Sequence, residues 1–164
     1  MKIEHFFLRY AYPCAYVLMQ RQEITQEELQ ELEEAAIQNQ DVPRERLEKV
    51  FHRAFDFIDQ LAKKRNKQRW DLEVIKEYFY SYHNEVIGKG EGIYATAPHT
   101  IKELSRVDTA TVIAKKGDVL IVQYQDWKNN LKTRNVFNHF VPRANIGDKV
   151  TIHYGYAVEI IGSE

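Results

Sequence analysis

The spacing of the hydrophobic positions changes about halfway along the chain. Up to residue 87 the apolar residues recur at intervals of three and four, which is typical of helices that bury one face. Beyond the glycine-rich stretch Gly88-Lys-Gly90-Glu-Gly92 they alternate with polar residues, as in half-buried strands. This change predicts an α+β fold, with a helical bundle over residues 1–87, a flexible linker over 88–106 and a small antiparallel β-barrel of OB-like or SH3-like type over 107–164.

The helical half carries clear start and stop signals. Pro13 interrupts the helical pattern of residues 3–22, which predicts either two short helices or one kinked helix. Thr25 and Glu28 have the spacing of a capping box, so we expect a helix to begin there. Pro43 suits the first turn of the next helix, where its missing N–H has no intrahelical partner to lose. These signals predict several short helices joined by brief turns.

The second half has the pattern of four or five short strands. After the turn signal at residues 147–148, Val150 and Ile152 fall on one side of a strand, and Thr151 and His153 fall on the other. This alternation predicts a half-buried strand whose polar side faces solvent. The remaining strands are expected at residues 109–114, 119–124, 131–137 and 157–161, and the first two of these form a hairpin around the turn at 115–118.

The last strand pair contains a recognisable segment, which reads Ile-Gly-Asp-Lys-Val-Thr-Ile-His-Tyr-Gly-Tyr-Ala-Val-Glu over residues 146–159. It resembles the closing motif of the small β-barrel hydrogenase maturation chaperones, the HypC/HupF family, which reads Val-Gly-Asp-Tyr-Val and then Val-His-Xaa-Gly-Phe-Ala-Ile-Glu. The resemblance extends over roughly residues 107–161. It implies a partner-binding role for His153, Tyr154, Gly155 and Tyr156, with a hydrogenase subunit or a maturation factor as the partner.

The resemblance also bears on metal binding. In the family, an amino-terminal Met-Cys presents a thiol that acts with the histidine of the closing motif in handling iron. His153 matches that histidine, but residues 103–109 contain no cysteine. We therefore expect no cofactor, and iron, if present, would involve His153 and Cys14. The alternatives are that His153 is a polar position on the outer face of a strand and that Cys14 is a small buried residue.

Charge provides a test of a second hypothesis, a nucleic-acid-binding small barrel. The chain has a net charge of −1; residues 1–87 contain 13 Lys/Arg and 16 Asp/Glu, and residues 88–164 contain 10 and 8. Neither half has the basic excess typical of binding driven by phosphate neutralisation. Clustering of the basic residues on one face around a stacking tryptophan would favour this hypothesis. The residues concerned are Lys115, Lys116, Trp127, Lys128, Lys132 and Arg134.

Other function classes have weaker signals. We find no nucleophile elbow, no metal-binding triplet at helical spacing and no glycine-rich phosphate loop, so the sequence does not predict an enzyme. No apolar run approaches the roughly 20 residues of a membrane span. One cysteine cannot form an internal disulfide, which fits a reducing cytoplasm. The sequence predicts a cytoplasmic, non-catalytic accessory or chaperone-like protein that binds a metalloenzyme or a maturation partner.

Overall fold

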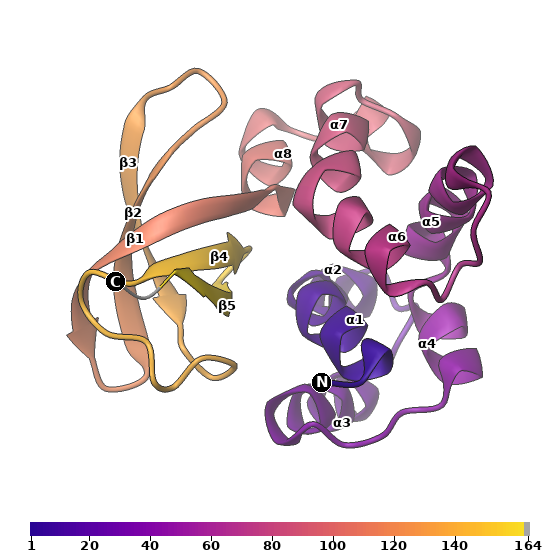
Figure 1. The fold of residues 1–164 in the computed structure, drawn as a ribbon, viewed down its shortest axis with the longest axis horizontal. Helices are drawn as coiled ribbons and strands as arrows, with labels where there is room; N and C mark the ends of the chain where they lie inside the picture. Colours follow the sequence, from indigo (N-terminus) through magenta and orange to yellow (C-terminus); the bar gives the residue numbers. More distant parts are fainter. Residues whose placement is uncertain (163–164) are drawn as a thin grey trace. The chain divides into compact units, whose positions relative to one another are not determined.

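The computed structural model of the protein describes residues 1–162. It divides into two compact units, Met1–Ala95 and Thr96–Glu164. The first unit is helical, and the second contains a five-stranded sheet preceded by one short helix (Figure 1). The prediction of a helical N-terminal part followed by a C-terminal sheet is therefore confirmed, and the boundary between the units lies within the predicted linker, residues 88–106.

The helices of the first unit are short and follow one another closely. One stretch, from α6 through η2 to α7, is continuous and contains a π-helical turn in its middle. The helices of the first unit are α1 Ile3–Ala11, η1 Tyr12–Cys14, α2 Ala15–Gln20, α3 Gln26–Gln38, α4 Arg44–Val50, α5 His52–Arg65, α6 Leu72–Glu77, η2 Tyr78–Tyr82, α7 His83–Gly88 and η3 Gly92–Ala95.

The predicted helix boundaries have the expected local causes. Pro13 lies in the 3₁₀ turn η1, which separates α1 from α2. The capping box is present: the Glu28 backbone N–H donates to Thr25 Oγ1 at 3.1 Å, and the Thr25 N–H donates to the Glu28 carboxylate at 2.9 Å. Asn39, with a φ of 52°, ends α3 in the left-handed conformation that asparagine tolerates. Local chemistry thus accounts for the segmentation of this unit.

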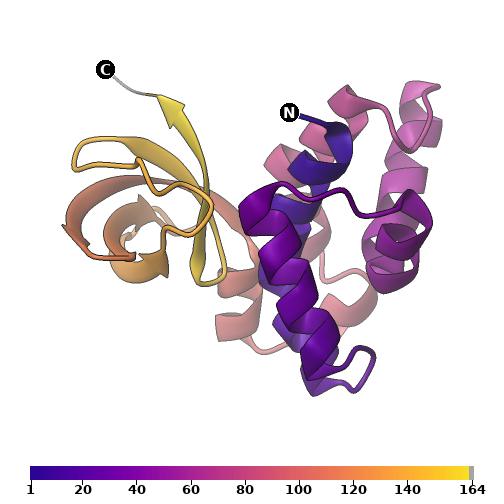
Figure 2. The ribbon, with the colours of Figure 1, turned by 90° about the horizontal axis from the view of Figure 1, so that it is seen from below.

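Aromatic rings form the centre of the helical unit. Phe7 on α1 has no exposed surface, and its ring centroid lies 4.8 Å from that of Phe55 and 5.5 Å from that of Trp70. The rings of Phe51 and Phe79 lie 5.6 and 5.7 Å from it. α3 lies beside α1 in both views (Figures 1 and 2). The helical spacing of the apolar residues therefore brings one face of each helix onto a shared core.

The second unit begins with α8, His99–Ser105, and continues into the sheet. β1 pairs with both β2 and β4, so the strand order β1-β2-β3-β5-β4 closes on itself (Figure 2). All neighbours are antiparallel except β3 and β5, which are parallel. The strands are β1 Val107–Lys116, β2 Val119–Gln125, β3 Leu131–Phe137, β4 Lys149–His153 and β5 Tyr156–Gly162.

The interior of the closed sheet is filled mainly by small and branched apolar side chains, such as Ala110, Leu120 and Val122. β4 differs from its prediction: Thr151 and His153 were expected to face solvent, but they are 5% and 0% exposed. The prediction of a half-buried strand is therefore wrong. The alternation in the sequence shows which residues are polar but not which are exposed. Polar side chains can be buried where their polar groups find hydrogen-bond partners.

None of the helices within residues 1–162 combines the length and the apolar character needed to cross a bilayer.

Candidate functional site

The turn between β4 and β5 contains the residues that the sequence assigned to partner binding. Tyr154 has a φ of 49°, which is unusual for a bulky residue. Its backbone N–H donates to the Leu104 carbonyl at 3.1 Å, and its hydroxyl lies 2.5 Å from Ser105 Oγ. Contacts with the end of α8 thus hold the turn in a strained conformation, and Gly155 is exposed at its tip.

An aromatic cluster adjoins this turn, and we refer to Phe137, His139, Phe140 and Tyr156 as the aromatic cluster. The rings of Phe137 and His139 stack with centroids 4.9 Å apart, and those of Phe140 and Tyr156 stack at 5.1 Å. Phe137 and Tyr156 are 5.7 Å apart. Phe137 remains 41% exposed. The cluster therefore offers a partly exposed aromatic surface.

Strand pairing builds this surface from distant segments. The Phe137 N–H donates to the Gly155 carbonyl at 2.8 Å, and Phe137 is the register partner of Tyr156 in the parallel β3–β5 pair. Tyr156 thus belongs to a larger surface, whereas His153 is fully buried at the end of β4. The predicted residues therefore differ in access: Gly155 is exposed, Tyr154 and Tyr156 are partly exposed, and the His153 side chain lies inside.

The cations of the nucleic-acid hypothesis do not share one face. Lys115 donates from Nζ to the Pro142 and Ala144 carbonyls at 3.0 and 2.8 Å, at the end of the sheet where β1 turns into β2. Lys116 lies at the same turn. Trp127 and Lys128 follow β2 at its other end.

Lys132 and Arg134 lie on the inward side of β3. Their register partners on β2 are Tyr124 and Val122, and Val122 belongs to the core. The outward side of β2 and β3 contains no lysine or arginine within these two strands; its members include Ile121, Gln123, Leu131, Thr133, Asn135 and Phe137. The outward side of β2 and β3 is therefore not a basic surface.

The inward-facing cations form part of what we call the charged end, where β1 and β3 begin and β2 ends. Asp108 pairs with the fully buried Ile152 and so faces the interior. The Arg134 guanidinium lies over the Tyr124 ring, 5.0 Å from its centroid. Arg106 Nε is 3.8 Å from Asp108 Oδ1. Two arginines and a carboxylate thus meet where apolar side chains fill the rest of the interior.

Several polar atoms at the charged end are buried without a hydrogen bond to any described residue. They are Nε, Nη1 and Nη2 of Arg134, Nε of Arg106 and Oδ2 of Asp108. Burial raises the pKa of Asp108, although Arg106 and Arg134 oppose that rise. Burial also lowers the pKa of Arg134. These arginines have donors to spare, because a guanidinium carries five N–H groups.

The other charges of this end are satisfied. Lys132 Nζ donates to Glu103 at 2.7 Å and lies 3.4 Å from Asp126, and the hydrogen bond to Glu103 raises the pKa of Lys132. Asp126 also accepts from the Asn130 N–H at 2.8 Å. Trp127, 37% exposed, stands at the rim with its indole 5.8 Å from the Arg106 guanidinium.

Sequence reasoning missed this arrangement. It placed Lys132 and Arg134 on the predicted strand 131–137, assigned them to a nucleic-acid-binding surface around the hairpin loops, and gave no role to Arg106 or Asp108. A signal existed, since Asp108 shares the parity of Ala110 and Val112, and Arg134 shares that of Val136. Two charged residues in register with core positions on different strands would have indicated a polar interior.

Cys14 lies in the first unit, at the end of η1. Burial raises the pKa of its thiol, which favours the protonated, unreactive form. A nitrogen of His83 lies within 4.8 Å of its sulfur, and His83 is 5% exposed. Thiolate and imidazole are ligands that suit zinc and iron. His153, the other predicted ligand, lies in the second unit.

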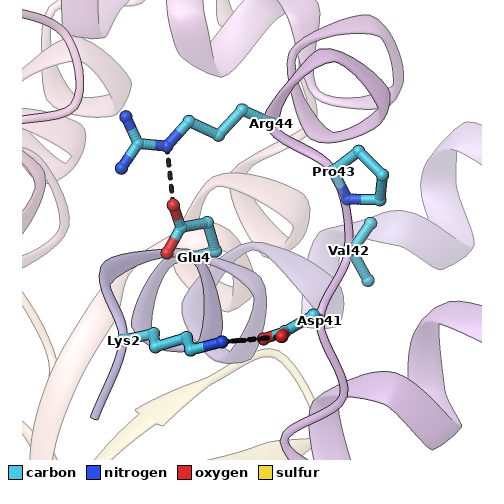
Figure 3. Close-up of a pocket in the computed structure, with 6 residues that line it drawn as sticks. All are labelled: Lys2, Glu4, Asp41, Val42, Pro43 and Arg44. Atoms are coloured by element: carbon cyan, nitrogen blue, oxygen red, sulfur yellow. Dashed lines mark hydrogen bonds and ion pairs between the residues drawn. The ribbon is translucent and has the colours of Figure 1, made fainter.

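The helical unit also has a surface hollow of about 530 Å³ lined by six residues (Figure 3). Its charges are already paired: Lys2 Nζ lies 2.6 Å from Asp41, and Arg44 Nε donates to Glu4 at 2.6 Å. Hydrogen bonds from Lys2 and His5 lower the pKa of Asp41. A charged ligand would have to displace these ion pairs.

Comparison of the chain with protein-family models, with curated proteins and with solved structures finds no match.

Proposed function

We propose that this protein is a non-catalytic, chaperone-like accessory protein that binds a protein partner through the aromatic cluster and the adjoining Tyr154–Gly155 turn. The observation that carries the proposal is the exposure of Phe137, 41%, within a cluster of four rings. Large aromatic side chains are enriched in the binding energy of protein interfaces. An exposed ring already held by neighbouring rings loses little conformational freedom on binding.

The resemblance to the HypC/HupF family supports the choice of partner. The similar segment includes the β4–β5 turn, and Tyr156 contributes to the aromatic cluster. The strand order, with β3 and β5 parallel, supports an OB-like barrel as the type of fold. We infer that the partner is a hydrogenase subunit or a maturation factor in the cytoplasm.

The nucleic-acid alternative has less support. OB-fold barrels bind oligonucleotides across the outer face of strands 2 and 3 and through the adjoining loops. On this chain that face is neutral along β2 and β3, and Lys132 and Arg134 point inward. Phosphate neutralisation, the main source of non-specific affinity, would have to rely on a few separated lysines.

The proposal is tested with a Phe137→Ala, Tyr156→Ala double variant. Tagged protein recovered from its native cell under reducing, oxygen-free conditions should bring down a hydrogenase subunit or a maturation factor. Titration calorimetry with that purified partner should then show at least a tenfold loss of affinity in the double variant, because truncated interface aromatics commonly cost about 2 kcal/mol or more.

Leu131→Ala is the matched control, because Leu131 is an apolar residue of β3 that is 64% exposed and lies outside the aromatic cluster. We expect it to bind as the unmodified protein does, and circular dichroism should show that all variants are folded. Equal affinity of the folded double variant and the control would refute the assignment of this surface.

A further inference from the structure

The charged end has more hydrogen-bond donors than acceptors. The three guanidinium nitrogens of Arg134 and Nε of Arg106 are buried and make no hydrogen bond to residues 1–162. Buried polar groups in folded proteins are almost always hydrogen-bonded, and an uncompensated buried charge is costly. An excess of this kind in one place indicates that a further group supplies the acceptors.

Charge balance gives the sign of the missing group. Three cations, Lys132, Arg106 and Arg134, stand with three carboxylates, Glu103, Asp126 and Asp108. Lys132 engages both Glu103 and Asp126, at 2.7 and 3.4 Å, whereas the nearest approach of Asp108 to Arg106 is 3.8 Å. Burial raises the pKa of Asp108 and so favours its uncharged form. With Asp108 protonated, three cations face two carboxylates, and an anion would supply both the missing charge and the missing acceptors.

The geometry also suits an oxyanion. The face of the Arg134 guanidinium lies over Tyr124, which supports the cation and leaves the N–H groups directed along the guanidinium plane. A planar fork of N–H donors matches two oxygens of a carboxylate or a phosphate. Arg106, with 20% of its side chain exposed, and Trp127, 37% exposed, lie at the solvent-facing edge of the charged end.

From these observations we propose that the charged end binds a small oxyanion, of the carboxylate or phosphate class, through Arg134 and Arg106. This inference is independent of the proposed protein-binding function, because it concerns different residues. The interior side chains Arg134 and Tyr124 hold the anion, Arg106 closes over it from the C-terminal end of α8, and Trp127 lies close enough to report its arrival.

The experiment uses the full chain with Trp70→Phe, so that Trp127 is the remaining tryptophan. Its fluorescence is titrated with sodium phosphate and, separately, sodium acetate, at constant ionic strength maintained with sodium chloride. We expect a saturable change with at least one of the two anions. Saturation by acetate alone identifies a carboxylate site, and saturation by phosphate alone identifies a phosphate site.

Variants connect the signal to the arginines. Arg134→Met should abolish the saturable change, and Arg134→Lys should weaken it at least tenfold because a lysine cannot form the planar fork. Arg143→Gln, at an exposed arginine in the loop before β4, is the control and should titrate like the background protein. If Arg134→Met does not fold, Arg106→Gln provides the same comparison with a residue nearer the surface.

The proposal is overturned if neither anion gives a saturable change. It is also overturned if the change persists in a folded Arg134→Met or Arg106→Gln protein, or if Arg143→Gln removes it equally. A ligand that raises the unfolding temperature of the background protein and leaves that of Arg134→Met unchanged would support it independently.

Discussion

The two units of this protein treat their charged residues in opposite ways. In the helical unit the charges lie at the surface in pairs, such as Arg46 with Glu31 at 2.6 Å and Arg53 with Glu23 at 2.6 Å. In the sheet unit Asp108 and Arg134 point into the interior, in register with core positions. Surface pairs contribute little to stability, whereas inward charges lower it unless they are fully compensated.

The interiors of the two units also differ in composition. Aromatic rings around Phe7 fill the centre of the helical unit, and its ion pairs, such as Arg46 with Glu31, lie at the surface. The sheet interior contains small side chains such as Ala110 and Ala157, and it becomes charged at one end. Proteins break local packing rules chiefly at sites that serve another purpose. We therefore expect the sheet unit to contain the functional surfaces and the aromatic core of the helical unit to contribute mainly to stability.

The largest effect is expected in the helical core. Phe7→Ala removes a fully buried ring in contact with several others, so it should lower the free energy of unfolding by about 3–5 kcal/mol. Urea denaturation followed by circular dichroism measures this loss. Tyr16→Ala, at a residue that is 53% exposed, should change stability by no more than about 0.5 kcal/mol. Similar losses for both variants would contradict the placement of the core.

A smaller loss should follow removal of one charge from the charged end. Asp108→Leu leaves both arginines without their shared carboxylate, and we expect a loss of about 1–3 kcal/mol. The double variant Asp108→Leu, Arg134→Leu should regain most of that loss, since replacing a buried pair with apolar residues is often neutral or stabilising. Denaturation of the single and double variants makes the comparison, and additive losses would show that the two side chains are not coupled.

The same carboxyl should give stability a characteristic pH dependence. The native pKa of Asp108 is raised above its ordinary value of 3.8, so the native state holds this proton more tightly than the unfolded state does. The stability that this proton contributes is fully present below pH 3.8 and is lost as the pH rises through the native pKa. Relative to Asp108→Asn, the free energy of unfolding of the unmodified protein should therefore fall from about pH 3 to pH 7, by at most about 1.4 kcal/mol per pH unit. Urea denaturation of both proteins across this range measures the difference, and a relative rise would refute the raised pKa.

Loss of the α3 cap should have a moderate effect within the helical unit. Thr25→Ala removes the acceptor of the Glu28 N–H and should cost about 1 kcal/mol. Thr25→Ser retains the hydroxyl and serves as the control in the same thermal unfolding experiment. If the two variants lose equal stability, the hydroxyl does not act as a cap.

The smallest effect is expected from a surface ion pair. Arg46 and Glu31 have side chains that are 39% and 62% exposed, so a double-mutant cycle to alanine should give a coupling free energy of at most about 0.5 kcal/mol. A much larger coupling would mean that the contrast between the surface pairs and the charged end is overstated.

The sequence predicted only some residues of the candidate site. Tyr156 was predicted from a short segment, but Phe137 and Phe140 join it through the parallel β3–β5 pairing. Arg134 was predicted to lie on a nucleic-acid-binding surface, but it points inward because it pairs in register with the core residue Val122. Such contacts depend on which strands pair, and no local pattern specifies that.

The sequence by itself determined the segmentation of the chain. The break at Pro13, the cap at Thr25 and the change of period near residue 88 all act within a few residues, where backbone sterics and local hydrogen bonds decide the outcome. The tertiary structure alone decided how the sheet closes, and with it the burial of His153 and the meeting of Arg106, Asp108 and Arg134. Closure joins strands that are distant in sequence, so it depends on the combined packing of the whole unit.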